Sequence, residues 1–76
     1  MPRLPRVTAR EIERALEKSG FVFARQRGSH LIYRHLESGL RVVIPDHGSQ
    51  VVPPGTLANI LRQARLEVDD FIQLLN

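Results

Sequence analysis

Two short turns in the middle of the chain restrict its fold more than any other feature. The first is Gly28–Ser29 and the second is Glu37–Gly39, and each lies between runs of residues typical of β-strands. The expected strands cover residues 21–27, 30–36 and 40–45. Strands joined by connections this short pair antiparallel with their neighbours. The sequence therefore predicts a three-stranded antiparallel meander.

The segment before the meander has the features of an amphipathic helix. Thr8 and Glu11 have the spacing of a capping box, and Gly20 is placed to end the helix in a left-handed conformation. Apolar residues fall on one helical face at Ala9, Ile12, Ala15 and Leu16. We therefore expect a helix over residues 8–19.

The segment after the meander predicts two more helices. Residues 46–54 are rich in glycine, proline and serine and are expected to form a loop. Thr56 is the expected N-cap, and the alternative is a first turn that already includes Pro54 or Gly55. The next helix presents its apolar side through Leu57, Ile60, Leu61 and Ala64. A last short helix has the same spacing at Val68, Phe71, Ile72 and Leu75. Asp69 and Asp70 lie in its first turn, where negative charge suits the helix dipole.

These elements predict an α+β fold of order α-β-β-β-α, with a short extra C-terminal helix and all helices on one face of the sheet. This is the layout of the double-stranded-RNA-binding domain. A chain of 76 residues is expected to form one domain, residues 1–76. The absence of cysteine excludes disulfides and thiolate zinc sites. Without a long apolar run or a signal peptide, we expect a cytoplasmic protein with no membrane contact.

Positive charge is concentrated in the first part of the chain. Residues 1–41 hold nine Lys/Arg and four Glu, a net charge of +5, whereas residues 42–76 hold two Arg and four Asp/Glu, a net charge of −2. Ten of the eleven cationic side chains are arginine, which offers a planar set of donors for phosphate. This pattern favours a polyanionic partner such as nucleic acid, and the alternative is a solvated surface that happens to be basic.

The candidate site is His30, which follows the Gly28–Ser29 turn. Imidazole transfers protons near neutral pH, so His30 could act as general base on a ribose 2′-hydroxyl or as acid to the leaving oxygen. Arg25 and Arg27 alternate onto one strand face and could hold the scissile phosphate and its neighbour, although plain solvent exposure is the alternative for each. Gly28 would allow close backbone approach, and Ser29 could donate to phosphate. The alternative is a histidine that ends a turn or stacks on a base without chemistry.

The chain has two other histidines. His35 has odd spacing from His30, so the two should point to opposite faces of the sheet, and we expect His35 to be structural. His47 follows the third strand and could supply a second proton carrier, although a loop histidine without a role is the simpler interpretation. No metal site is expected from these three residues, because the first two diverge. Tyr33 shares a face with Leu31 and His35, where it could stack on a base, but a core or partner contact is the commoner role.

Several segments, in order along nearly the whole chain, resemble the HicA toxins, small mRNA interferases of bacterial and archaeal toxin–antitoxin pairs. The matching segments are Gly20-Phe21, Arg25-Gln26-Arg27-Gly28-Ser29-His30, Ile32-Tyr33-Arg34-His35, Val42-Val43-Ile44-Pro45, His47-Gly48, Gly55-Thr56-Leu57 and Ile60-Leu61-Arg62-Gln63-Ala64. The resemblance implies a double-stranded-RNA-binding-like fold and endoribonuclease activity on mRNA, with the catalytic histidine at His30. It also implies a HicB-like antitoxin as partner and no metal or other cofactor.

Two functions from other classes compete with this interpretation. The chain could be a non-catalytic RNA-binding module that uses the same basic surface without turnover. It could also be an inactive toxin remnant that acts through its contact with the antitoxin.

Overall fold

The computed structural model describes residues 3–76 and contains three helices and three strands. In chain order the elements are α1 (Ala9–Lys18), β1 (Phe21–Arg27), β2 (His30–His35), β3 (Arg41–Pro45), α2 (Pro54–Ala64) and α3 (Val68–Leu74). The strands form one antiparallel sheet of order β1-β2-β3. The predicted α+β fold, with its meander and extra C-terminal helix, is confirmed.

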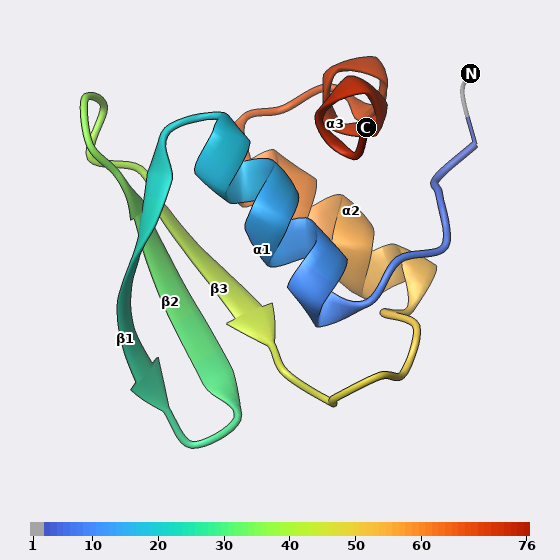
Figure 1. Cartoon of the computed structure of the whole chain (residues 1–76), viewed down its shortest axis with the longest axis horizontal. Coiled ribbons are helices and arrows are strands. Elements are labelled where there is room, and N and C mark those ends of the chain that lie inside the picture. The colour runs from blue at the N-terminus through green and yellow to red at the C-terminus, as the bar shows by residue number, and fades with distance from the viewer. Residues whose placement is uncertain (1–2) are drawn as a thin grey trace.

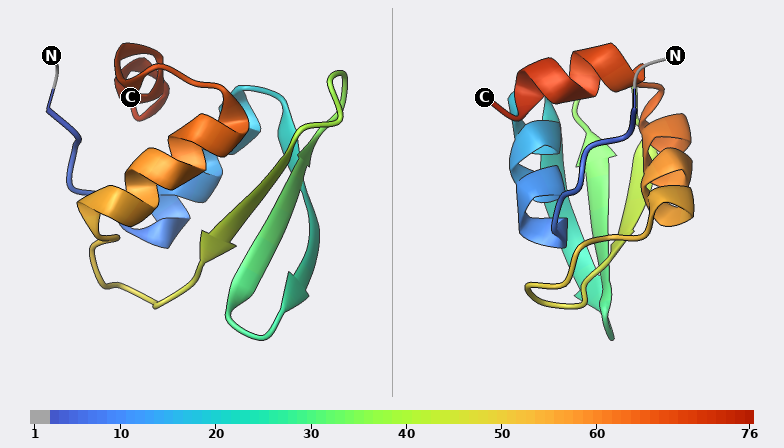
Figure 2. Two further views of the ribbon diagram at one scale, coloured as in Figure 1. Left: turned by 180° about the vertical axis from the view of Figure 1, so that it is seen from behind. Right: turned by 90° about the vertical axis from the view of Figure 1, so that its right-hand side faces the viewer.

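The helices lie on one side of the sheet and leave the other side open (Figure 1). Helices α1 and α2 run side by side against the sheet, and α3 crosses one end of the pair (Figure 2). The core between the layers is apolar, and its largest fully buried side chains are Phe71, Ile12, Leu16, Ile44, Leu57, Ile60 and Val42. Burial of this apolar area is the main favourable contribution to folding.

Helix α1 begins at the predicted capping box. The Thr8 hydroxyl accepts a hydrogen bond from the Glu11 backbone N–H at 3.3 Å, and the Glu11 carboxylate accepts one from the Thr8 backbone N–H at 2.9 Å. These bonds satisfy donors that the first helical turn leaves free. The apolar face predicted from the sequence is the buried face of α1.

Helix α2 begins before Thr56, as in the alternative that includes Pro54 in the first turn. Its N-cap is Pro53 and its first residue is Pro54, so the expected N-cap Thr56 already lies within the first turn. Proline suits this position because its fixed φ matches the helix and the N–H it lacks would have no helical acceptor. Two strands are each one residue shorter than predicted, because β2 ends at His35 and β3 begins at Arg41.

Gly20 joins α1 to β1 under two constraints. Its φ is +101°, in the region that side chains disfavour. A Cβ at this position would also lie 2.8 Å from Nε2 of His35, whose ring contacts the Ser19 carbonyl oxygen at 3.0 Å. A side chain at position 20 would therefore strain the backbone and displace the imidazole.

Gly20→Ala should lower the free energy of unfolding by about 2–3 kcal/mol, because backbone strain and a steric clash act together. Urea unfolding measures this. Gly39→Ala is the matched control, because Gly39 has a φ of +76° but nothing within 4 Å of an added Cβ. The control should lose only about 1 kcal/mol. Equal losses for the two variants would show that the contact with His35 contributes nothing.

Candidate nucleic-acid interface

The open face of the sheet carries arginines, one histidine and a few apolar residues. Strand pairing places on this face Val22, Arg25, Arg27, His30, Ile32, Arg34, Arg41, Val43 and Pro45. None of these residues is acidic. Long basic side chains therefore extend into solvent from all three strands without an opposite charge among them, and we name this surface the arginine face.

A β-bulge decides which side of β1 contributes to the arginine face. Phe21 is buried toward the helices, so regular alternation would point Arg25 and Arg27 toward the same layer. The register instead shifts between Phe23 and Arg25, leaving Ala24 unpaired, and Arg25 pairs with Ile32. Both arginines consequently share the open face with His30.

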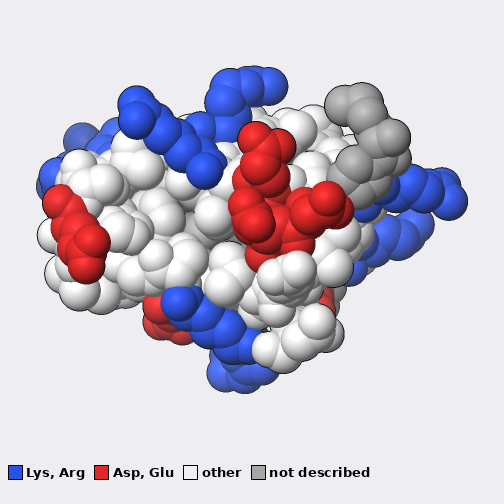
Figure 3. Space-filling model, turned by 90° about the horizontal axis from the view of Figure 1, so that it is seen from above, with Lys and Arg blue, Asp and Glu red and all other residues white. Residues whose placement is uncertain are grey.

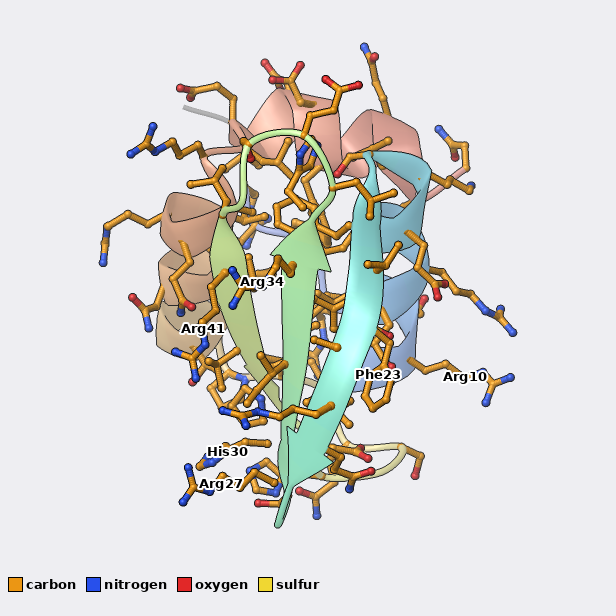
Figure 4. The ribbon with its side chains drawn as sticks, turned by 90° about the vertical axis from the view of Figure 1, so that its left-hand side faces the viewer. Arg10, Phe23, Arg27, His30, Arg34 and Arg41 are labelled. Atoms are coloured by element: carbon orange, nitrogen blue, oxygen red, sulfur yellow. The ribbon has the colours of Figure 1, made fainter. Side chains whose placement is uncertain are left out.

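His30 lies at the edge of the arginine face, where the β1–β2 hairpin turns. It is exposed and pairs with Arg27 on one side and Pro45 on the other. Figure 4, which faces the open side of the sheet, shows His30 and Arg27 next to each other near the turn. The imidazole is thus accessible to solvent beside a guanidinium group.

The turn before His30 is tight and leaves free space around it. Of its two residues only Gly28 has a positive φ, +61°, as in the hairpin turns that place glycine first. Nothing lies within 4 Å of the position that a Cβ of Gly28 would occupy. The Ser29 carbonyl oxygen accepts from the Asp46 N–H at 2.6 Å, which ties the turn to the end of β3. The space beside Gly28 is therefore open to a ligand backbone.

Arg34 and Arg41 also belong to the arginine face, although neither was among the candidate site residues predicted from the sequence. They are direct cross-strand partners on β2 and β3, and both are exposed. Figure 4 shows them on the same side of the sheet as His30. The even spacing between His30 and Arg34 was a usable signal, but the position of Arg41 opposite Arg34 depends on the register.

Ile32 lies at the centre of the arginine face and is only 4 % exposed. It is absent from the helix-side core cluster, so side chains of the open face must cover it. Its direct neighbours across the sheet are Arg25 and Val43. The aliphatic stems of long basic side chains commonly shield apolar groups in this way. Ile32 is therefore covered and does not form an exposed apolar patch on this face.

His35 has a structural environment, as expected. Its ring packs edge-on against Phe21, with centroids 4.9 Å apart, on the helix side of the sheet. Its Nδ1 lies 3.2 Å from the Glu37 N–H and 3.1 Å from the Ser38 N–H, both of which can only donate. Nδ1 is therefore the acceptor, and Nε2 carries the proton that it donates to the Ser19 carbonyl. Its ring nitrogens are thus occupied by backbone groups.

His47 lies in the loop that follows β3, near the same end of the sheet as His30. Pro45 pairs with His30 and is two residues before His47. The exposed His47 lines a small hollow of about 80 Å³ with Pro45, Val52, Pro53 and Thr56. The loop is held by the bond from the Gly48 N–H to Oδ1 of Asp46, 3.0 Å long. The chain path thus brings His47 to the neighbourhood of His30 without placing it on the arginine face.

Tyr33 points away from the arginine face and into the core. It is 2 % exposed, and its hydroxyl donates to Oε1 of Glu13 at 2.6 Å. Burial, followed by the hydrogen bond to Glu13, raises the pKa of Tyr33 above its ordinary value. The phenol therefore stays protonated near neutral pH, and its bonded position under α1 excludes stacking on a base.

Acidic side chains gather away from His30. Figure 3 views the end of the molecule where α3 lies and shows a cluster of acidic side chains there. Asp69 and Asp70 in the first turn of α3 belong to this end, whereas the β1–β2 turn lies at the opposite end in Figure 1. Asp69 and Asp70 are thus kept apart from His30, whereas Asp46 adjoins the β1–β2 turn through its N–H bond to the Ser29 carbonyl.

The part of the chain that the structure describes, residues 3–76, has no group of three or more histidine, aspartate or glutamate side chains placed to hold a metal ion. Within the same residues, no helix has the length and apolar character needed to cross a membrane.

Comparison with known families places the chain in one of them. The family model described as "HicA toxin of bacterial toxin-antitoxin" matches residues 9–66, which include α1, the whole sheet and α2. No curated protein matches the chain. The family match covers most of the chain, including every residue on the arginine face. The protein belongs to the HicA family, the toxins of bacterial toxin–antitoxin systems.

Proposed function

We propose that this toxin is an endoribonuclease that cleaves mRNA, with His30 as the proton-transfer residue. The observation that carries the proposal is the exposed imidazole of His30 on a sheet face whose charged residues are all arginine. Membership of the HicA family supports the same activity. The chemistry needs no metal, since imidazole and guanidinium groups can supply proton transfer and charge.

The proposed reaction uses the substrate's own 2′-hydroxyl as nucleophile. His30 removes the proton from this hydroxyl, and the 2′-oxygen forms a bond to the adjacent phosphorus. The bond from phosphorus to the 5′-oxygen breaks, and that oxygen takes up a proton. The products are a 2′,3′-cyclic phosphate and a new 5′-hydroxyl end, so no atom or electron has to come from a co-reactant.

The arginines next to His30 would hold the reacting phosphate. Arg27 is the cross-strand partner of His30. Arg25 lies on the same face, two residues before Arg27 on β1. Negative charge accumulates on the phosphate oxygens during the reaction, and preorganised guanidinium donors stabilise it. Gly28 and Ser29 would complete the subsite by leaving room for the backbone of the RNA and offering a hydroxyl donor.

His30→Ala should reduce RNA cleavage by about 10²–10⁴-fold, because the variant has no general base at the reacting hydroxyl. Folding and RNA affinity should remain, since the side chain is exposed and the arginines are untouched. Fragmentation of a labelled single-stranded RNA measures the first effect, and anisotropy of the same RNA measures the second.

The His30→Ala comparison also separates the competing functions. Fragments with 5′-hydroxyl ends from the wild type, and none from the variant, support the enzyme. A wild type that binds RNA without any fragmentation would identify a non-catalytic RNA-binding module. Cleavage at the parental rate by the variant would remove His30 from the mechanism.

A second proton carrier would have to protonate the leaving 5′-oxygen, and we propose His47 for this role. His47→Ala should then lower cleavage by about 10²-fold or more. It should also remove the alkaline limb of the bell-shaped pH–rate profile, because a general acid acts only while it is protonated. The profile of kcat/KM for wild type and variant checks this. An unchanged rate and profile would assign the donation to water.

We also propose that a HicB-like antitoxin neutralises the toxin. Membership of a toxin family implies an antitoxin partner. Co-expression of this chain with the product of the neighbouring reading frame should relieve growth arrest and yield a complex that copurifies. A neighbouring product that forms no complex and leaves growth arrest unchanged would contradict this pairing.

A further inference from the structure

Arg34 and Arg41 form a pair of like charges with no counter-charge on their face. They are direct partners in the antiparallel ladder between β2 and β3. Like charges in this position repel, and an opposite charge on a neighbouring strand position would normally relieve them. Here the flanking position on β1 is Val22, which pairs with Arg34. The fold therefore leaves two guanidinium groups side by side that can bind an anionic group of a ligand.

The pair is too far from His30 to hold the scissile phosphate. His30 and Arg34 are four residues apart on one strand, which corresponds to about 13 Å at the rise of a β-strand. A single nucleotide of an extended strand does not cover this distance. Ile32 lies between them on the same strand face and is 4 % exposed, so the surface there is formed by its cross-strand neighbours Arg25 and Val43.

We propose that Arg34 and Arg41 form a distal subsite for a second phosphate of the RNA substrate, about two nucleotides from the bond that is cut. This inference rests on the proposed ribonuclease function. With this subsite the enzyme would prefer single-stranded RNA of several nucleotides over shorter substrates. The planar fork of arginine suits phosphate oxygens, and two such groups side by side can clamp one phosphate.

The composition of the face favours a nucleic-acid backbone over a protein as the occupant. Protein interfaces depend on a central apolar or aromatic anchor. Of the described large exposed apolar residues, Val22 belongs to the arginine face, at 40 % exposure, and Leu36 lies beyond its end in the β2–β3 turn. Phe23 faces the other side of the sheet with Tyr33. Figure 4 likewise shows Phe23 and Arg10 beyond β1, apart from the labelled arginines of the open face. Repeated cationic groups along a strand instead match a repeated anion.

The test compares cleavage of a dinucleotide, which has only the scissile phosphate, with cleavage of an octanucleotide. The wild type should have a kcat/KM about tenfold or more higher for the octanucleotide, because the longer strand reaches the distal subsite. The Arg34→Gln/Arg41→Gln double variant should lose this gain while cleaving the dinucleotide at the wild-type rate.

Arg14→Gln/Arg62→Gln is the matched control, because it removes the same charge from exposed positions on α1 and α2. The control should keep the gain with substrate length. Circular dichroism should show native folding for both double variants, since none of the four side chains is buried. A gain that persists in Arg34→Gln/Arg41→Gln, or that is lost equally in the control, overturns the subsite.

Binding tests the subsite independently of cleavage. Each phosphate contact to single-stranded RNA contributes about 0.7 to the slope of log K against log salt concentration. Loss of the pair should therefore lower this slope by at least about 0.7, measured by anisotropy of the octanucleotide. If the wild type cuts no RNA of any length, the ribonuclease proposal fails, and this slope alone decides the subsite. An unchanged slope together with loss of antitoxin binding would assign the pair to a protein contact and overturn the proposal.

Discussion

A three-stranded sheet in a chain of this size can bury only one of its faces. The three helices supply enough apolar surface for a single layer, and all of them lie on the same side of the sheet. The opposite face has no covering element and must be compatible with water. This one-sided burial is the constraint on which the candidate site depends, because it leaves a flat, rigid surface from which charged side chains extend.

The bulge at Ala24 shows how local irregularity serves that arrangement. Phe21 has to be buried against α1, and Arg25 and Arg27 have to be solvated, yet all three have the same parity along β1. One unpaired residue between them reconciles the two requirements. Edge strands tolerate bulges well because only one ladder is interrupted, and β1 is an edge strand of this sheet. The other edge strand, β3, is instead tied to α2 by the bond from the Val43 N–H to the Gln63 side chain, 3.0 Å long.

The three histidines illustrate how the same side chain takes different roles in different environments. The ring nitrogens of His35 are occupied by backbone groups, and its ring packs on Phe21, so it holds the connection between α1 and β1. His30 is exposed among arginines, where its nitrogens are free to meet a substrate. His47 occupies a loop that the chain path brings near the end of β3. Their places in the fold separate these histidines, since one lies on the open face, one on the helix side of the sheet and one in a loop.

Features that depend on a few consecutive residues were determined by the sequence alone. The capping box at Thr8, the left-handed Gly20 and the two short turns each rest on contacts between residues close in the chain, and these features predicted the order of the elements. The strand parity also predicted that His30 and His35 diverge. Only the tertiary structure decided that Arg25 and Arg27 join His30 on the open face, that Arg34 lies opposite Arg41, and that Ile32 is covered there. These outcomes depend on the register between strands, which is set by the packing of distant residues against one another and is not contained in any short segment.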